Sequence, residues 1–450
     1  MRSISGSTVY NSALHFLSIA ALCFVASPML RAQDWFHLES SNGAERIRIA
    51  VADFKPQSAD ASTFKHAFDA TLFADLNAAG IFDIVSKGLI PQSSPGAPAE
   101  MNLSEWSAPP SKAAMVAFGS VATQGGRLVV NGYLDDAKNA QFPQVFAKQY
   151  SEDASENEAR QIAHRFADEI ISRLGGGVAG IAETKIYYVK ILGQNKEIWE
   201  MDYDGQNQHA LTHLNTVSLS PRISPDNSRL AFSALGREGF QIKMYSLLLN
   251  RMVNFTAAGG TNLSPAWAPT GNQLAFSSSR TGDPEIWTSD REGNVAHRVT
   301  NFRGPDVSPV WNPKTGAQIA WISGRTGLPQ LYIMDADGSG VQRMTDGGYA
   351  TSPSWSPNGQ FLAFAWSRKY GPGAPGGQDI YIMEITTKRW IQLTHGIGRC
   401  DFPSWSPDGR HLVFANGSGA RARVMTMLAD GTQQHALTES GADMPNWSWK

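Results

Sequence analysis

Short apolar runs separated by turn residues fill the second half of the chain. In residues 264–300 four such runs follow one another, at 265–268, 273–277, 285–288 and 296–300. Runs of this length are too short for helices, and proline, glycine, asparagine and aspartate separate them. Asp-Gly and Asn-Gly pairs recur in the gaps, where they supply the positive φ angles that tight hairpins require. The pattern predicts four antiparallel strands joined by short turns.

This pattern of strands recurs along the chain. Each copy opens with a proline that is followed two residues later by tryptophan, or by isoleucine in the first copy. We call these prolines the registering prolines, because each marks the same position in its repeat: Pro221, Pro265, Pro309, Pro353, Pro403 and Pro445. They are 44, 44, 44, 50 and 42 residues apart. A period near forty with four short strands per unit is typical of a β-propeller blade. We expect the tryptophans to pack neighbouring blades against each other.

The two ends of the repeat region complement each other. Residues 185–213 carry three strand-like runs with no first strand, and residues 445–449 supply a first strand with nothing after it. Together they make one complete blade, which joins the first blade to the last and removes exposed sheet edges. The sequence therefore predicts an all-β six-bladed propeller over residues 178–450, closed by pairing of the C-terminal strand with the first blade.

The pattern before the propeller is different. Apolar residues recur at every fourth position over 64–76 and 162–174, and strand-like runs lie at 47–51, 81–85, 114–122, 127–134 and 144–150. Ser155 and Glu158 have the spacing of a capping box at the start of the second helix. Three glycines at 175–177 interrupt that helix. Residues 47–177 are thus predicted to form an α+β domain.

The first 46 residues are predicted to lie outside both domains. Residues 1–32 have the pattern of a secretory signal peptide, with Arg2, an apolar core and a cleavage site after Ala32. Residues 33–46 carry no strong fold signal and are predicted to be a mobile N-terminal segment. Trp35 and Phe36 in this segment are candidate anchors for a partner, although they would pack equally well on the first domain.

Composition and charge narrow the classes of function. The chain contains 42 glycines and 24 prolines but only 17% charged residues, which suits a turn-rich β protein. Without the signal peptide it has 36 basic and 40 acidic residues. With no basic stripe to neutralise phosphates, we expect no nucleic-acid binding. Cys400 is then the one remaining cysteine, so no intramolecular disulfide is possible.

Motifs for catalysis or metal binding are missing or better explained as turns. The sequence has no G-x-S-x-G nucleophile elbow. His209 and His213 have a metal-like spacing, but they fall on an outer strand rather than a helix. The D-x-D-G segments at 202–205 and 335–338 fall where hairpin turns are required. We expect no catalytic, cofactor or metal site; the alternative is a propeller hydrolase or lyase acting on periplasmic peptides or sugars.

Several segments carry a family resemblance. The repeated SPAW, SPSWSPNG and FPSWSPDG segments, KIYYV from Lys185 and RIAVADF from Arg48 resemble the TolB family of the Tol-Pal system, over nearly the whole mature chain. The resemblance implies a non-enzymatic periplasmic scaffold that binds the lipoprotein Pal over one propeller mouth and TolA through its N-terminal region. It also implies a role in outer-membrane integrity and envelope constriction during cell division. We expect a monomer that is peripheral to a membrane at most.

Strand direction predicts which propeller face binds the partner. We call face one the side with the loops that enter the first strands and the turns between second and third strands; face two is the opposite side. The chain enters the propeller at a second strand, so the N-terminal domain should lie near face two. The residues before the registering prolines would then ring the open mouth of face one: Asn262, Leu263, Asp306, Val307, Thr351, Arg399, Asp401 and Asp443.

The aspartates at this predicted mouth have two interpretations. Asp306, Asp401 and Asp443 would form a negative rim for a basic partner surface, or each would simply cap a turn. A six-residue surplus near residues 370–377 falls in a turn on the same face, where it would reshape the partner surface or be a tolerated insertion.

Overall fold

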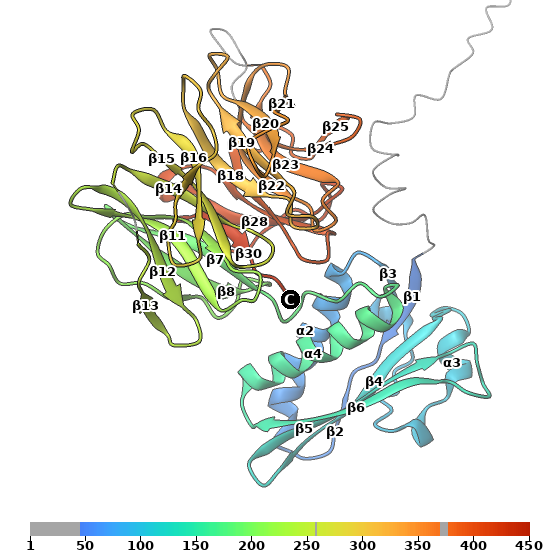
Figure 1. Cartoon of the computed structure of the whole chain (residues 1–450). Coiled ribbons are helices and arrows are strands. Elements are labelled where there is room, and N and C mark those ends of the chain that lie inside the picture. Colours follow the sequence, from blue (N-terminus) through green and yellow to red (C-terminus); the bar gives the residue numbers. More distant parts are fainter. Residues whose placement is uncertain (1–45, 257–258, 370–376) are drawn as a thin grey trace, which may run out of the picture.

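The computed structural model describes residues 46–256, 259–369 and 377–450. Figure 1 shows an α+β domain beside a ring of sheets, with the C-terminus lying between the two. The predicted signal peptide, Trp35 and Phe36, and most of the insertion near residues 370–377 lie outside the described residues.

The N-terminal domain is one mixed sheet with two long helices on one face. The sheet order is β3-β1-β4-β5-β6, with β2 beside β4. The pairs β1–β3 and β1–β4 are parallel, whereas β4, β5 and β6 are antiparallel. The elements are β1 (Ile47–Val51), β2 (Lys55–Pro56), α2 (Ala61–Ala78), β3 (Phe82–Ile84), η1 (Lys87–Leu89), η2 (Pro98–Glu100), α3 (Leu103–Ser107), β4 (Met115–Gln124), β5 (Arg127–Asp136), β6 (Gln144–Asp153) and α4 (Glu156–Leu174).

Aromatic side chains fill the core between this sheet and its helices. Phe54, Phe68 and Phe166 are fully buried, and the ring of Phe54 lies 4.6 Å from that of Phe68 and 6.0 Å from that of Phe166. Ser155 caps α4 by accepting a hydrogen bond from the Glu158 N–H at 3.1 Å, so the predicted start of this helix is confirmed.

The described residues after α4 form six four-stranded sheets. Blade one is β10 (Ser218–Ile223), β11 (Arg229–Gly236), β12 (Gly239–Ser246) and β13 (Arg251–Val253), and blade two is β14 (Asn262–Trp267), β15 (Gln273–Ser278), β16 (Glu285–Asp290) and β17 (His297–Arg298). Blade three is β18 (Asp306–Trp311), β19 (Gln318–Ser323), β20 (Gln330–Asp335) and β21 (Gln342–Arg343), and blade four is β22 (Tyr349–Trp355), β23 (Phe361–Ser367), β24 (Asp379–Glu384) and β25 (Trp390–Gln392). Blade five is β26 (Cys400–Trp405), β27 (His411–Asn416), η3 (Gly419–Arg421), β28 (Arg423–Leu428) and β29 (His435–Ala436). Blade six is β30 (Ala442–Trp447), β7 (Lys185–Leu192), β8 (Asn195–Asp202) and β9 (His209–Ala210).

Blade six closes the ring in the predicted way. Strand β30 pairs antiparallel with β7, with Asn446 opposite Tyr187 and Trp447 opposite Ile186. The buried Trp447 indole donates a hydrogen bond to the Thr184 hydroxyl at 2.8 Å. A strand from the end of the chain therefore covers what would otherwise be an open sheet edge.

Every first strand of a blade contains the same local irregularity. The residue before each registering proline has a positive φ, for example 53° at Ser264, and the strand register shifts between Leu263 and Ala266. Because one extra residue is accommodated there, each first strand bends at the channel. The following tryptophans reach the preceding blade: the Trp267 Nε1 donates to the Arg222 carbonyl at 3.0 Å. The predicted packing between blades is confirmed.

The N-terminal domain lies against face two. The His411 side chain, after a turn on face two of blade five, meets the Ala78 carbonyl at the end of α2 at 2.8 Å. On blade six, the Tyr203 hydroxyl donates to Asp75 of α2, and Arg160 of α4 pairs with Asp204. This is the orientation that strand direction predicted, and these contacts leave the turns of face one outside the domain interface.

Candidate functional site

Two of the predicted mouth residues are buried inside the blades. Asn262 and Asp306 have no exposed surface. The Asn262 amide donates to Gln241 Oε1 at 2.9 Å, and an Asp306 carboxylate oxygen accepts from Arg325 Nη2 at 3.0 Å. Their side chains hold neighbouring strands together. The expectation of an exposed negative rim is therefore wrong at Asp306.

Three other predicted residues meet in one hydrogen-bonded network between blades four and five. The Thr351 hydroxyl donates to Asp401 Oδ1 at 3.1 Å, and Arg399 Nη2 donates to Asp401 Oδ2 at 2.9 Å. Gln378, which the sequence did not single out, donates to Thr351 and accepts from Arg399. Asp401 is 4% exposed, whereas the Arg399 side chain is 53% exposed. The network therefore presents its cation to solvent and buries its carboxylate, so the expectation of an exposed negative rim is wrong at Asp401 as well.

The remaining predicted residues line the mouth without joining that network. Leu263, Val307 and Asp443 are half-buried. Burial raises the pKa of Asp443, the nearby Asp401 carboxylate adds to the effect, and Arg399 opposes it. Asp443 is thus a weak source of negative charge, because burial disfavours its ionised form.

Face one carries a repeated pair of arginine and aromatic ring that sequence reasoning missed. In the turns between second and third strands, the guanidinium carbon of Arg280 lies 4.4 Å from the centre of the Trp287 ring. In the next two blades Arg325 lies 4.6 Å from Phe302, and Arg368 lies 4.3 Å from Trp390. Each pair holds a cation over a π face.

A sequence signal for these arginines exists. Each lies one or two residues after a serine at the end of a second strand. The Arg280 and Arg325 Nε groups donate to Ser278 and Ser323 at 3.1 and 2.8 Å, respectively. The serine hydroxyl therefore fixes the orientation of the guanidinium, and the aromatic ring packs against the arginine side chain in that orientation.

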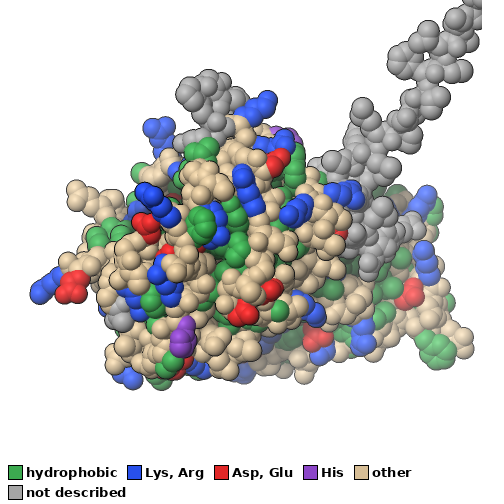
Figure 2. Space-filling model, turned by 45° about the horizontal axis from the view of Figure 1, so that its top comes forward, with side chains coloured by type: hydrophobic (Ala, Val, Ile, Leu, Met, Phe, Trp, Pro, Cys, Tyr) green, Lys and Arg blue, Asp and Glu red, His purple; other side chains and the backbone are tan. Residues whose placement is uncertain are grey.

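The exposed charge on face one is predominantly basic. Exposed acidic residues in its turns and loops are Glu238, Asp283, Asp346 and Glu439. Exposed basic residues there are Arg237, Arg303, Arg368, Lys369, Arg399, Arg421 and Arg423. Among the half-buried residues, Lys190, Lys196, Arg280 and Arg325 outnumber Asp379 and Asp443. In Figure 2, where the top of the molecule comes forward, Lys and Arg side chains are spread over the propeller. This surface suits an acidic partner, which reverses the expected complementarity.

A possible metal-ligand cluster lies at the domain interface rather than on face one. Within the described residues, ligand atoms of His164, Asp202 and Asp204 all lie within 4.8 Å of one another. Asp202 already pairs with Lys185, and Asp204 pairs with Arg160. Because these cations already neutralise both carboxylates, the cluster is better suited to joining the domains than to holding an ion.

Two further features of the described residues bear on function. Cys400 is fully buried in the core of blade five, which makes it a packing residue rather than a surface thiol.

None of the helices in the described ranges combines the length and apolar character needed to cross a bilayer.

Comparison with known proteins identifies the family. Residues 173–450 match the model of the TolB beta propeller domain, and residues 40–141 match that of the TolB amino-terminal domain. The chain belongs to the TolB family. The predicted resemblance and the six-bladed propeller are confirmed.

Individual TolB relatives support the assignment. The chain is 29% identical over 304 residues to the protein TolB homolog of Chlorobium luteolum, covering 67% of each protein. It is 31% identical over 235 residues to the Tol-Pal system protein TolB of Gluconobacter oxydans, covering 51% of this chain and 49% of that one. The crystal structure of TolB from Acinetobacter baumannii superposes with a TM-score of 0.76 at 25% identity, covering 90% of this chain and 98% of that one.

The sequence alignments are partial. Those with the TolB homologs of Chlorobium chlorochromatii and Chlorobium luteolum cover 44% and 67% of the relatives' lengths. Membership of the TolB family makes the chain a Tol-Pal system protein and favours the predicted non-enzymatic class over a propeller hydrolase or lyase.

Proposed function

We propose that the chain is a non-enzymatic periplasmic scaffold of the Tol-Pal system that binds a Pal-like outer-membrane lipoprotein on face one of its propeller. In this proposal a TolA-like inner-membrane protein binds the N-terminal region, through Trp35 and Phe36. The scaffold supports outer-membrane integrity and envelope constriction during cell division.

The position of the N-terminal domain carries this proposal. Its hydrogen bonds with the propeller, among them those at His411, Tyr203 and Asp204, involve face two. Among the described residues, the domain contacts thus leave face one uncovered, and in this proposal a macromolecular partner binds there. Face one carries arginines held over aromatic rings, which combine apolar area with a fixed charge, as binding hot spots commonly do.

The predicted mouth residues fit this proposal in two roles. Leu263, Val307, Thr351, Arg399 and Asp443 are partly or fully exposed and would touch the partner. Asn262, Asp306 and Asp401 would not touch the partner but would position side chains that do. They form hydrogen bonds with Gln241, Arg325 and Arg399, respectively.

Calorimetry tests the Pal proposal. The mature protein is titrated with the soluble domain of its own Pal-like lipoprotein, and wild type is compared with the double variant Arg280→Glu, Arg368→Glu. The matched control is Arg173→Glu, Arg251→Glu, which changes the net charge equally but lies away from face one. We expect binding to weaken by about tenfold or more in the first variant and to stay unchanged in the control. Absence of binding by the wild type would overturn the proposal.

A second titration tests the N-terminal segment separately. Trp35→Ala, Phe36→Ala should lose binding to the periplasmic domain of a TolA-like protein while keeping the affinity for the Pal-like lipoprotein. Equal affinity of wild type and variant for the TolA-like domain would exclude these two residues as anchors.

A further inference from the structure

The propeller channel contains a cavity at its face-two end. Its volume is about 100 Å³, and it is lined by the prolines of the turns after the first strands and by the tryptophans that end those strands. The residue after each registering proline also lines it: Arg222, Ala266, Val310, Ser354, Ser404 and Asn446. Five of these six residues are small or neutral. Arg222 is the exception.

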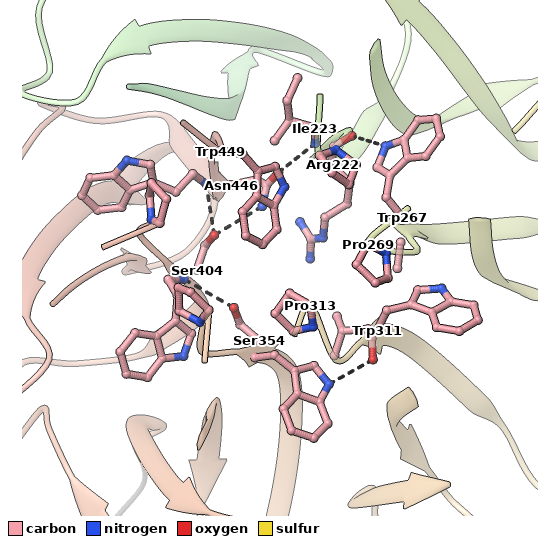
Figure 3. A pocket seen from close by; sticks show the side chains of 18 of the residues that line it. Arg222, Ile223, Trp267, Pro269, Trp311, Pro313, Ser354, Ser404, Asn446 and Trp449 are labelled. Carbon is pink, nitrogen blue, oxygen red and sulfur yellow. Dashed lines mark hydrogen bonds between the residues drawn. The ribbon is translucent and has the colours of Figure 1, made fainter. Parts of the chain in front are cut away.

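Arg222 extends into the middle of this cavity (Figure 3). Its hydrogen bond runs from Nη1 to the carbonyl of its own neighbour Pro221, at 2.8 Å. It forms no ion pair within the described residues, and none of the described residues that line the cavity is acidic. Burial without a counter-charge lowers the pKa of Arg222 to about 10. A cation in this position is costly unless an anion accompanies it.

The opposite wall supplies further donors. Ser404 Oγ accepts a hydrogen bond from the Trp447 N–H at 3.0 Å, and Ser354 Oγ accepts one from the Trp405 N–H at 3.4 Å. A hydroxyl that accepts from a backbone N–H still has its own proton to donate. Both serines lie across the cavity from the guanidinium (Figure 3). The site thus combines a fixed cation with neutral donors in an apolar surrounding.

We propose that this cavity binds one small oxyanion, a carboxylate or a phosphate, with the Arg222 guanidinium as its cationic receptor and the Ser354 and Ser404 hydroxyls as supporting donors. The planar guanidinium offers two parallel N–H groups that match the two oxygens of such an anion. Proline and tryptophan side chains make up much of the wall around the guanidinium, and an apolar surrounding strengthens the pairing. The site lies on the face opposite the proposed Pal surface, so the two proposals stand or fall separately.

Arginine-selective NMR tests this site. Mature protein labelled with 15N-arginine is titrated with sodium acetate and, separately, with sodium phosphate, while sodium chloride holds the ionic strength constant. The Nε–H resonance of Arg222 is assigned by its loss in Arg222→Ser, which introduces the residue that blades four and five carry at this position. Arg237→Ser, at an exposed turn on face one, serves as the control.

We expect the Arg222 resonance to shift and saturate with a dissociation constant on the order of 1 mM for at least one of the two anions. Exposed arginines should shift at least about tenfold less at the same concentration. Arg222→Lys, followed through the shifts of neighbouring arginine resonances, should bind more weakly while keeping the charge, because lysine lacks the paired donors. The titration that saturates identifies the anion class.

Three results would overturn the proposal. One is an Arg222 resonance that responds to both anions no more than exposed arginines do. The second is an Arg222→Lys variant that binds as tightly as wild type. The third is a saturable shift at neighbouring resonances that persists in a folded Arg222→Ser protein. Thermal unfolding of each variant verifies folding, and the Arg237→Ser control shows that the loss of any arginine does not by itself remove the response.

Discussion

At the scale of single residues, Asp75 is the acceptor that ties the two domains together. It is almost fully buried in α2 and accepts from the Tyr203 hydroxyl of the propeller and from His164 of α4. A buried acceptor that loses a partner keeps its desolvation cost. Residues with no special sequence pattern therefore carry the domain interface.

Replacing Tyr203 with phenylalanine tests this role. Tyr203→Phe should destabilise the protein by about 1–3 kcal/mol, because hydrogen bonds to ionisable groups are stronger than those between neutral groups. Tyr188→Phe is the control, since the Tyr188 hydroxyl donates to the neutral Gln208 amide oxygen at 3.0 Å. Its cost should be about 1 kcal/mol or less. Urea unfolding followed by fluorescence measures both, and equal losses would contradict the special role of Asp75.

At the scale of elements, the closing strand β30 secures the ring. Trp447 on this strand is 3% exposed and packs in a cluster with Ile186, Val413 and Val424 from blades five and six. Trp447→Ala should cost about 3–5 kcal/mol, as large-to-small core substitutions do. Trp449 lies just beyond the strand and is half-buried, so Trp449→Ala should lower the stability clearly less than Trp447→Ala does. Thermal unfolding compares the two, and a Trp449→Ala loss as large as that of Trp447→Ala would argue against β30 as the closing element.

The elements that the sequence predicts are those with a local, repeated cause. Registering prolines, Asp-Gly turns and the strand missing from one end of the repeat were enough to predict six blades and their closure. The bulge at Ser264 and its equivalents was not predicted, because a positive φ before proline has no obvious residue signature. The Arg280–Trp287 pair was missed because its two members lie on different elements and meet only in the folded blade.

Burial explains why the predicted mouth was only partly right. Strand direction placed Asp306 and Asp401 in the loops that enter the first strands, whereas both lie within those strands, which begin at Asp306 and Cys400. It could not tell which side chains point between blades, because the bulge changes their alternation. Arg325 and Arg399, which neutralise these carboxylates, come from a neighbouring turn and an entering loop.

At the scale of the whole molecule, histidines in the domain interface make the domain contact depend on pH, and His411 is the one that bridges both domains. His411 Nδ1 lies 3.1 Å from Asp408 Oδ2, and its Nε2 lies 2.8 Å from the Ala78 carbonyl. Both partners are acceptors, so only the protonated ring donates to both. Burial disfavours that charge and Arg410 opposes it, but the Asp408 carboxylate and the Ala78 carbonyl together outweigh them, and the pKa of His411 is raised.

The direction of the pH effect follows from this raised pKa. Stabilisation by protonated His411 is complete below about pH 6.5, the ordinary histidine value, and is lost as pH rises through the folded-state pKa. Burial alone would raise the pKa of Asp408, but His411 lowers it below 3.8. The Asp408 contribution is therefore present above that value and lost only in stronger acid. The domain contact should be strongest between these limits and should loosen on the alkaline side.

Hydrogen exchange at the end of α2 measures this loosening. Between pH 6 and pH 9, exchange near Ala79, corrected for its intrinsic rate, should speed up in the wild type. His411→Gln should weaken that dependence, whereas the exposed His435→Gln on blade five should keep it. Some dependence should remain in His411→Gln, because Asp75 outweighs the burial of His164 in the same interface and raises its pKa too. A corrected exchange rate that is equal at both pH values in the wild type would contradict the loss of the His411 proton between pH 6 and pH 9.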